Sequence, residues 1–237
     1  MTGRLSGRRI FLTGVSRGVG LSTARLFLRE GADLVGVARD SQRLASVTEE
    51  LSELAPGRFE AFALDVSDPD APGLAHDRLK ARWGALDVLF NNAGVMLSEA
   101  VDFEQEPPGT LDETLEVNLS APFYLTLTLL PLLRRGKEPR IVHVSSGAGT
   151  FGALAEPKIA SYRLSKWALN GLTLIQAAQL RGQVAVNAFD PGWVKTDLGG
   201  PNAPGTTEES ARGALSLVCE PFSTTGKFFK DGQEIPF

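Results

Sequence analysis

Side chains that form disulfide bonds and metal sites are scarce in this sequence. Its 237 residues include one cysteine, Cys219, and two histidines, His76 and His143. A single thiol excludes a disulfide within the chain, and so few thiol and imidazole groups argue against a structural zinc site. We therefore expect no metal.

Basic charge and long apolar segments are also scarce. The net charge is −4 and the pI is near 5.3, whereas proteins that bind nucleic acid usually carry a basic excess or stripe. No run of residues approaches the roughly 18 apolar residues that span a membrane, and the apolar residues at 10–12 are too few for a signal peptide. We expect no nucleic acid or membrane as partner, and a cytoplasmic location.

Short apolar runs alternate with longer segments of helical period. The predicted strands are Arg9–Thr13, Ala32–Ala38, Phe59–Leu64, Asp87–Phe90, Arg140–Ser145, Gln183–Phe189 and Gly226–Phe229. The predicted helices are Gly18–Glu30, Ser41–Ala55, Pro69–Trp83, Thr110–Arg134, Ile159–Arg181 and Thr207–Cys219. This alternation predicts right-handed crossovers and a parallel sheet covered on both faces. We expect residues 1–237 to form a single doubly wound α/β (Rossmann) domain with about seven parallel strands.

A glycine-rich turn follows the first predicted strand. Glycine lets phosphate oxygens approach the backbone, and the helix N-terminus supplies free N–H groups and the positive end of a dipole. The turn therefore predicts a site for the pyrophosphate of a dinucleotide. Its spacing differs from the G-x-G-x-x-G pattern, so a glycine-rich turn without a ligand is the alternative. The predicted binding residues are Gly14, Ser16, Arg17, Gly18, Val19 and Gly20.

Arginine stands where the second predicted strand ends. An acid at this point hydrogen-bonds the ribose 2′-hydroxyl of NAD, whereas an arginine accommodates the 2′-phosphate of NADP. Arg39 occupies this region, with Arg17 and Arg43 nearby in sequence, and this favours NADP(H) over NAD(H). The alternative is that Arg39 is solvated and Asp40 contacts the ribose or caps the next helix.

Tyr162 and Lys166 stand four residues apart in a predicted helix. Positions i and i+4 share a helix face, so the phenol and the ammonium can share one site. A nearby cation lowers the pKa of a phenol from its ordinary value of about 10, which favours a role as acid or base. Taken alone, the pair also fits a partly exposed aromatic residue beside a solvated lysine. The other tyrosine, Tyr124, lies in a different predicted helix.

Asn118 lies four residues before Pro122 in the predicted helix Thr110–Arg134. Proline has no N–H, so the Asn118 carbonyl loses its ordinary partner. A buried free carbonyl needs water or a side chain. We expect a kink here and a bound water; the alternative is a kinked core helix without one.

The order of these motifs resembles the short-chain dehydrogenase/reductase family over nearly the whole chain. The residues that carry the resemblance are Thr13–Gly20, Asp65, Asn91 to Gly94, Asn118, Ser146, Tyr162, Lys166 and Pro191-Gly192. The tail from Pro191 to Asp231 looks like the NADPH-dependent carbonyl-reductase-like branch.

The resemblance implies a role for each motif. Ser146 would bind the substrate oxygen, Tyr162 would transfer the proton, and Lys166 would hold the nicotinamide ribose. Asn118 would hold a water that links Lys166 to solvent. Residues implied to contact the adenine, ribose and nicotinamide are Asp65, Val66, Asn91, Ala93, Gly94, Pro191, Gly192, Val194 and Thr196. Simple turns are the alternatives at Asp65, at the two asparagines and at Pro191-Gly192.

Four features depart from the pattern or stay open. The separation of Ser146 and Tyr162 exceeds the family's usual spacing, so Gly147–Ser161 contains an insertion. His143 replaces a frequent asparagine, and we expect it to be packed or hydrogen-bonded; the alternative is a catalytic base. We expect Glu99–Glu106 to be a solvated loop. A further set of side chains could line an apolar pocket or belong to the core: Met96, Leu97, Phe151, Leu154 and Trp193.

The prediction is therefore an oxidoreductase that transfers hydride between NADP(H) and a carbonyl or alcohol substrate. Two alternatives are an NAD(H)-dependent alcohol dehydrogenase of the same fold and a nucleotide-binding sensor without turnover. The resemblance allows a homodimer or homotetramer, paired along the helix Ile159–Arg181 with Trp167 or Leu174 outward, or a monomer.

Overall fold

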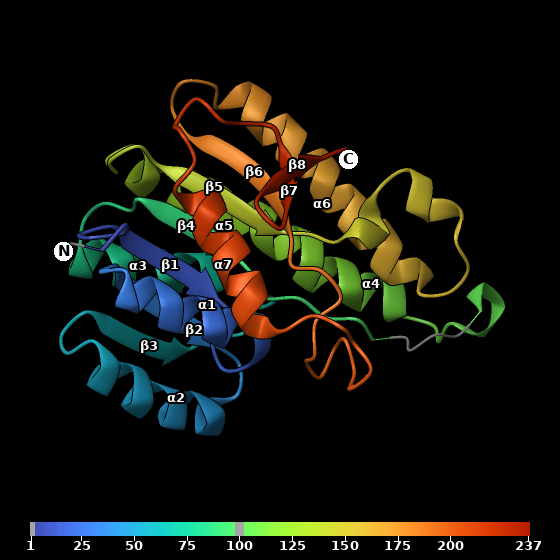
Figure 1. Cartoon of the computed structure of the whole chain (residues 1–237), viewed down its shortest axis with the longest axis horizontal. Coiled ribbons are helices and arrows are strands. Elements are labelled where there is room, and N and C mark those ends of the chain that lie inside the picture. Colours follow the sequence, from blue (N-terminus) through green and yellow to red (C-terminus); the bar gives the residue numbers. More distant parts are fainter. Residues whose placement is uncertain (1–2, 98–101) are drawn as a thin grey trace.

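A central sheet organises the part of the chain that the computed structural model describes, residues 3–97 and 102–237. The strand order is β3-β2-β1-β4-β5-β6-β7-β8 (Figure 1). The strands are β1 (Arg9–Thr13), β2 (Asp33–Ala38), β3 (Phe59–Ala63), β4 (Val88–Asn91), β5 (Arg140–Val144), β6 (Ala185–Asp190), β7 (Phe228–Lys230) and β8 (Gln233–Ile235). Neighbours from β3 to β7 pair in parallel, which confirms the predicted fold class.

The eighth strand corrects the predicted number of seven. β8 pairs with β7 in antiparallel register. Asp231 and Gly232, both at positive φ (51° and 76°), form the turn between them. Asp-Gly between extended segments is a strong hairpin signal, and it could have revealed this strand. Each of its residues is exposed or half-buried, so no apolar pattern marked it.

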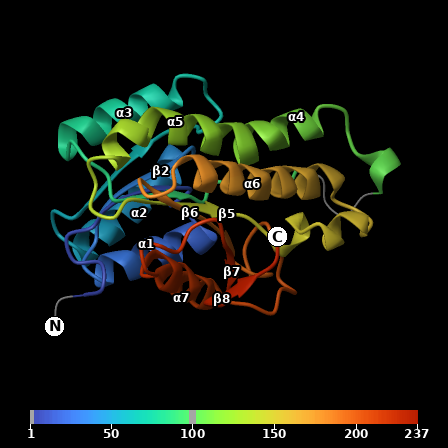
Figure 2. The ribbon, with the colours of Figure 1, turned by 90° about the horizontal axis from the view of Figure 1, so that it is seen from above.

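Helices cover both faces of the sheet (Figure 2). One face packs against α1 (Gly18–Arg29), α2 (Ser41–Leu54) and α7 (Thr207–Val218), and the core between them includes Phe27 and Phe90. The other face packs against α3 (Ala71–Arg82), α5 (Ala121–Leu133) and α6 (Ala160–Gln179), with Leu89 and Leu129 in its core. Two separate apolar layers explain why the strands read as continuous apolar runs.

The helix predicted at Thr110–Arg134 is interrupted. It consists of α4 (Thr110–Leu115), a π-helical turn (Glu116–Ser120) and α5. The turn ends where Ala121 N–H bonds to the Glu116 carbonyl, one residue before Pro122, which has no N–H to donate. A proline therefore produces a π turn here instead of the simple kink that we predicted.

By length and composition, the segment Thr110–Leu133 could cross a membrane, with mean hydropathy 1.2. In the structure 44% of its apolar window is buried, and Leu125, Leu129 and Leu133 pack in the core. The core helix of a soluble fold has the same composition, so this segment gives little support to a membrane span.

The strand order reverses between β1 and β4. In open α/β sheets a crevice forms outside the carboxyl ends of the strands at such a point, and ligands bind there. The glycine-rich turn follows β1, and the segment Asn91 to Gly94 follows β4. The topology therefore brings these two motifs together.

Candidate active site

The glycine-rich turn joins β1 to α1 and requires glycine on steric grounds. Gly14 has a positive φ of 77°. A Cβ atom at Gly20 would lie 2.0 Å from the Gly14 carbonyl oxygen. The Asn92 amide donates hydrogen bonds to the carbonyls of Thr13 (2.8 Å) and Gly14 (3.1 Å). This arrangement leaves backbone N–H groups at the start of α1 and fits the predicted phosphate site.

Charged side chains surround the end of β2. Arg39 is exposed, lies 3.9 Å from Asp65, and lines a cavity of about 200 Å³ together with Ser67 and Val95. Asp40 accepts a hydrogen bond from the Arg43 backbone N–H (3.0 Å). Asp40 therefore caps α2, as the alternative reading allowed, and Arg39 remains the candidate for contact with the nucleotide.

Asp197, in the segment after β6, forms ion pairs with Arg17 and with Arg43 (3.6 Å). Arg17, Arg39 and Arg43 thus lie on the same side of the site, each with a carboxylate nearby. The Asp65 carboxylate also accepts hydrogen bonds from the Ser67 N–H (3.0 Å) and hydroxyl (2.7 Å). Both the turn-capping alternative and a role toward adenine are compatible with this geometry.

The segment after β4 is held by residues from two other elements, β1 and the π-helical turn. Ala93 N–H donates to the Thr13 hydroxyl (3.0 Å). The Asn118 side chain accepts from Val95 N–H (2.8 Å) and donates to the Val95 carbonyl (2.9 Å) and to the Ser165 hydroxyl (3.0 Å). The side chain of Asn118 therefore fixes the backbone around Gly94 and ties it to α6. The water expected at its carbonyl stays a prediction.

Ser146, Tyr162 and Lys166 converge at the carboxyl end of β5. Ser146 follows β5, and the other two lie on the buried face of α6. The Lys166 ammonium lies 5.6 Å from the centre of the Tyr162 ring and donates to the Val144 carbonyl (2.9 Å). Gly94 faces this ammonium: a Cβ there would lie 3.4 Å from Lys166 Nζ. The structure thus joins the pair to the segment after β4.

The pKa of Tyr162 differs from our expectation. Burial raises it to about 12, a hydrogen bond with Ser146 acts in the opposite direction, and the charge of Asp190 raises it further. Burial lowers the pKa of Lys166 to about 8, with Asp190 opposing the shift. Among the protein groups, desolvation therefore outweighs any effect of the lysine, and the expected lowering of the tyrosine pKa was wrong.

Asp190 is a buried carboxylate that we did not single out in the sequence. It ends β6, accepts from Gly192 N–H (2.9 Å) and lies 3.7 Å from Lys230 Nζ. Its charge raises the pKa of both Tyr162 and Lys166. An acid at a strand end, just before Pro191, was the available signal.

The segment after β6 approaches the glycine-rich turn. A Cβ atom at Gly18 would lie 3.1 Å from the Thr196 methyl group, so these two motifs are adjacent. Val194 is buried, and the Thr196 hydroxyl donates to its carbonyl (3.3 Å) and accepts from Gly199 N–H (3.0 Å). Thr196 thus lies beside the predicted pyrophosphate site, in the same segment as Pro191, Gly192 and Val194.

Arg163 organises the insertion Gly147–Ser161. Its nearly buried guanidinium donates to the carbonyls of Ala153 (3.0 Å) and Lys158 (3.1 Å) and pairs with Glu156 (3.0 Å). The sequence placed this arginine directly beside Tyr162, but nothing in a linear pattern identified its partners.

Glu106 is not a solvated residue as we had expected. Its carboxylate accepts from the N–H (3.2 Å) and the hydroxyl (2.7 Å) of Ser161, and so caps the start of α6 next to Tyr162. Glu99 and the other residues at 98–101 lie outside the described part of the chain.

The apolar side chains left open between pocket and core are not core residues. Leu97, Phe151 and Trp193 are exposed by 46%, 75% and 60%, while Met96 and Leu154 are half-buried. They follow the carboxyl ends of β4, β5 and β6, the side of the sheet where ligands bind in open α/β folds.

His143 is packed and hydrogen-bonded, which confirms the prediction. Its Nδ1 accepts from the Asn91 amide (3.2 Å), and its Nε2 donates to Gln176 (2.9 Å). Burial lowers its pKa to about 4, so the ring is neutral at ordinary pH.

The fold and these clustered side chains define a class: an α/β protein with a nucleotide-type crevice and a serine, tyrosine and lysine at its edge. The family model described as short chain dehydrogenase matches residues 8–206, and the chain belongs to this family of oxidoreductases. The predicted resemblance is confirmed.

Relatives and solved structures agree with this assignment. The chain is 31% identical over 235 residues to 3-oxoacyl-(acyl-carrier-protein) reductase FabG of Thermotoga maritima, covering 99% of this chain and 91% of that protein. It is 33% identical over 204 residues to oxidoreductase UcpA of Salmonella typhimurium, covering 83% and 73%. An NADPH-bound carbonyl reductase from chicken fatty liver superposes with TM-score 0.90 at 28% identity, covering 98% of this chain and 100% of that one.

Proposed function

We propose that this protein is an NADP(H)-dependent oxidoreductase that acts on a carbonyl or alcohol substrate, with Tyr162 as the general acid and base. One observation carries the proposal: the Tyr162 phenol, hydrogen-bonded to Ser146, is buried beside the Lys166 ammonium at the edge of the nucleotide-type crevice. A purely nucleotide-binding protein has no need of this set of groups.

The residues fit a nicotinamide dinucleotide. The glycine-rich turn is tight, because a Cβ atom at Gly20 would lie 2.0 Å from the Gly14 carbonyl oxygen. Arg39 borders a cavity at the end of β2. The arginines 17, 39 and 43 favour a 2′-phosphate over a free hydroxyl. The similar carbonyl reductase is described as NADPH-bound, which supports the same choice.

When bound, the nicotinamide group supplies or accepts the hydride. The remaining chemistry falls to the chain. Because burial raises the pKa of Tyr162 to about 12, the phenol is protonated at neutral pH and suited to donate a proton to the oxygen of a carbonyl being reduced. Ser146 offers a second hydrogen bond to that oxygen, and donors already in place stabilise developing negative charge.

Lys166 and Asn118 prepare the tyrosine for this role. The Lys166 ammonium, on the same face of α6, would hydrogen-bond the ribose next to the nicotinamide. Asn118 fixes Val95 and Ser165 and so positions the floor of the site; the proton relay through a water at its carbonyl belongs to this proposal.

The substrate side is apolar. Leu97, Phe151 and Trp193 lie in the segments that follow β4, β5 and β6 and are exposed, so burying them against a ligand is favourable. We propose carbonyl compounds with an aromatic or aliphatic body as substrates.

The test is a panel of aromatic and aliphatic ketones and aldehydes, assayed by oxidation of NADPH and of NADH in parallel. We expect turnover with NADPH in preference to NADH. Preference for NADH would support the alternative alcohol dehydrogenase, and tight NADPH binding without turnover on any compound would support a sensor.

We also propose a homodimer as the smallest assembly. Exposed apolar side chains lie on two helices on one face of the molecule: Phe123, Tyr124 and Leu127 on α5, and Trp167, Leu174 and Ile175 on α6. Light scattering after size-exclusion chromatography distinguishes monomer, dimer and tetramer.

A further inference from the structure

A second pocket lies at the amino ends of the strands, whereas the candidate active site lies at their carboxyl ends. It has a volume of about 250 Å³ and is bordered by three arginines, Arg4, Arg8 and Arg140, and by Glu138 and Glu220. Arg140 opens β5, whereas the catalytic serine follows the other end of that strand. We call this site the arginine pocket.

Arg140 is buried with too few partners. Its side chain is 6% exposed, and its nearest carboxylate oxygen, on Glu138, is 3.9 Å away. Its Nε and Nη1 atoms are buried and find no hydrogen-bond partner in the described residues. Burial and the charge of Arg8 lower its pKa, because both disfavour the charged guanidinium. A buried guanidinium of this kind calls for an anion.

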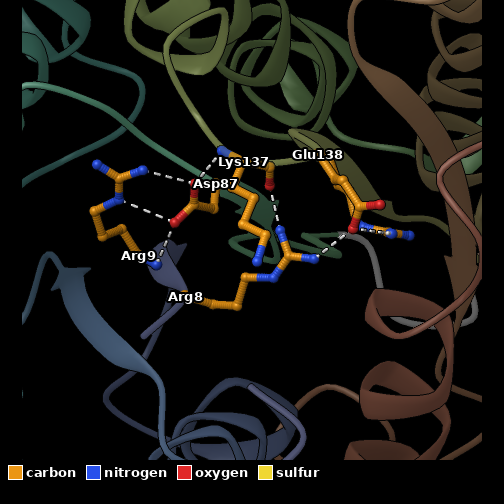
Figure 3. A network of polar contacts seen from close by, with 6 residues as sticks. Arg8, Arg9, Asp87, Lys137 and Glu138 are labelled. Carbon is orange, nitrogen blue, oxygen red and sulfur yellow. Dashed lines mark hydrogen bonds and ion pairs between the residues drawn. The ribbon is translucent and has the colours of Figure 1, made fainter. Parts of the chain in front are cut away.

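The neighbouring arginines show what a satisfied guanidinium looks like here (Figure 3). Arg9 donates two hydrogen bonds to Asp87, at 2.8 and 2.9 Å. Arg8 donates to the Lys137 carbonyl and to Glu138 (2.8 Å). Within residues 3–97 and 102–237, by contrast, the exposed Arg4 side chain makes no hydrogen bond or ion pair.

The acids at the pocket do not balance this charge. Glu138 is half exposed and already pairs with Arg8. Glu220 acts on the Arg140 guanidinium only through its charge at longer range, since no ion pair joins the two residues in the described part of the chain. Two carboxylates therefore face three guanidiniums, and the most buried of these, Arg140, has only a long contact of 3.9 Å with Glu138.

We propose that the arginine pocket binds a phosphate group, supplied by inorganic phosphate or by a phosphate monoester. Guanidinium groups bind phosphate oxygens through paired, charge-assisted hydrogen bonds. A volume of about 250 Å³ corresponds to roughly eight water molecules at about 30 Å³ each, enough for a phosphate and a few further atoms. Leu5 and Phe222 also border the pocket and offer an apolar surface to the organic part of an ester.

The experiment uses protein saturated with NADP⁺, so that the nucleotide crevice cannot bind the added phosphate. Calorimetric titrations with inorganic phosphate and with phenyl phosphate are run at constant ionic strength on the wild type and on Arg4→Gln, Arg140→Lys and Arg181→Gln. Arg181 is exposed and follows α6, so Arg181→Gln is the matched control for loss of one surface charge.

We expect saturable binding to the wild type and to Arg181→Gln, and a dissociation constant at least about tenfold higher in Arg4→Gln. Arg140→Lys keeps the charge but loses the planar fork, and we expect the same weakening. Because Arg4 is exposed, we expect Arg4→Gln to fold, so this variant tests phosphate binding even if Arg140→Lys does not fold.

Tighter binding of phenyl phosphate would identify a monoester as the ligand, and equal affinities would identify the inorganic ion. Absence of saturable binding to the wild type, or equal affinities of the wild type and Arg4→Gln, would overturn the proposal.

Discussion

The ionisable side chains on the nucleotide side of the candidate site are exposed, whereas those on the proposed catalytic side are buried. On the nucleotide side, Arg17, Arg39 and Asp197 have side chains that are 58%, 59% and 65% exposed, and their ion pairs face solvent. On the catalytic side, Tyr162 and Lys166 are 8% and 4% exposed. Exposed pairs are worth about 0–1 kcal/mol and can rearrange around a ligand, whereas burial shifts the pKa values of Tyr162 and Lys166. Selectivity for the nucleotide should therefore be easy to alter, and catalysis should not.

The largest effect should come from the buried side. Tyr162→Phe removes the proton donor and keeps the ring, so we expect the rate of carbonyl reduction to fall by about 10²- to 10⁴-fold while NADPH binding is unchanged. Tyr124→Phe, at the exposed second tyrosine, is the control and should keep full activity. Steady-state rates and NADPH fluorescence titrations measure both; full turnover by Tyr162→Phe would rule out its assigned role.

A buried base should also make stability depend on pH. His143 has its pKa lowered from 6.5 to about 4, so between these values the unfolded chain binds a proton that the folded chain does not. The free energy of unfolding should therefore fall as pH decreases from 6.5 to 4, by about 3 kcal/mol in total from this group.

Urea unfolding at a series of pH values measures this dependence. His143→Asn should reduce the slope, whereas His76→Asn, at the partly exposed second histidine, should not. The same slope in His143→Asn and in the wild type would show that other groups cause it.

A smaller effect is expected on the exposed side. Arg39→Asp replaces a favourable charge by a repulsive one, and we expect kcat/KM with NADPH to fall about 10- to 100-fold with little change for NADH. Arg181→Asp is the matched control for charge reversal at the surface. An unchanged preference for NADPH in Arg39→Asp would mean that Arg39 does not contact the 2′-phosphate.

The smallest effect concerns the insertion between Ser146 and Tyr162. Arg163→Ala removes the bonds to Ala153, Glu156 and Lys158, and we expect KM for the carbonyl substrate to rise several-fold with kcat nearly unchanged. Arg181→Ala should change neither constant. A loss confined to kcat would instead show that Arg163 acts on Tyr162.

Features built from local sequence were predictable. Strand-and-helix alternation predicted the fold, and the glycines of the turn and the spacing of Tyr162 and Lys166 marked their positions because each depends on local geometry. The sequence did not indicate that Glu106 caps α6, that Arg163 holds the insertion, or that Asp190 lies near Tyr162 and Lys166. Glu106 and Asp190 lie far along the chain from Tyr162, and the Arg163 contacts lie within an irregular segment that has no repeating pattern. The raised pKa of Tyr162 depends on how completely the fold excludes water.

The π-helical turn at Glu116–Ser120 also sets the rotational phase between α4 and α5. A π turn holds one more residue than an α turn, and one residue corresponds to about 100° of helix rotation. Deleting a single residue there would restore a regular spiral and turn α4 about its axis relative to α5. Asn118 would then no longer face Val95 and Ser165, so the site depends on the length of this segment as well as on its residues.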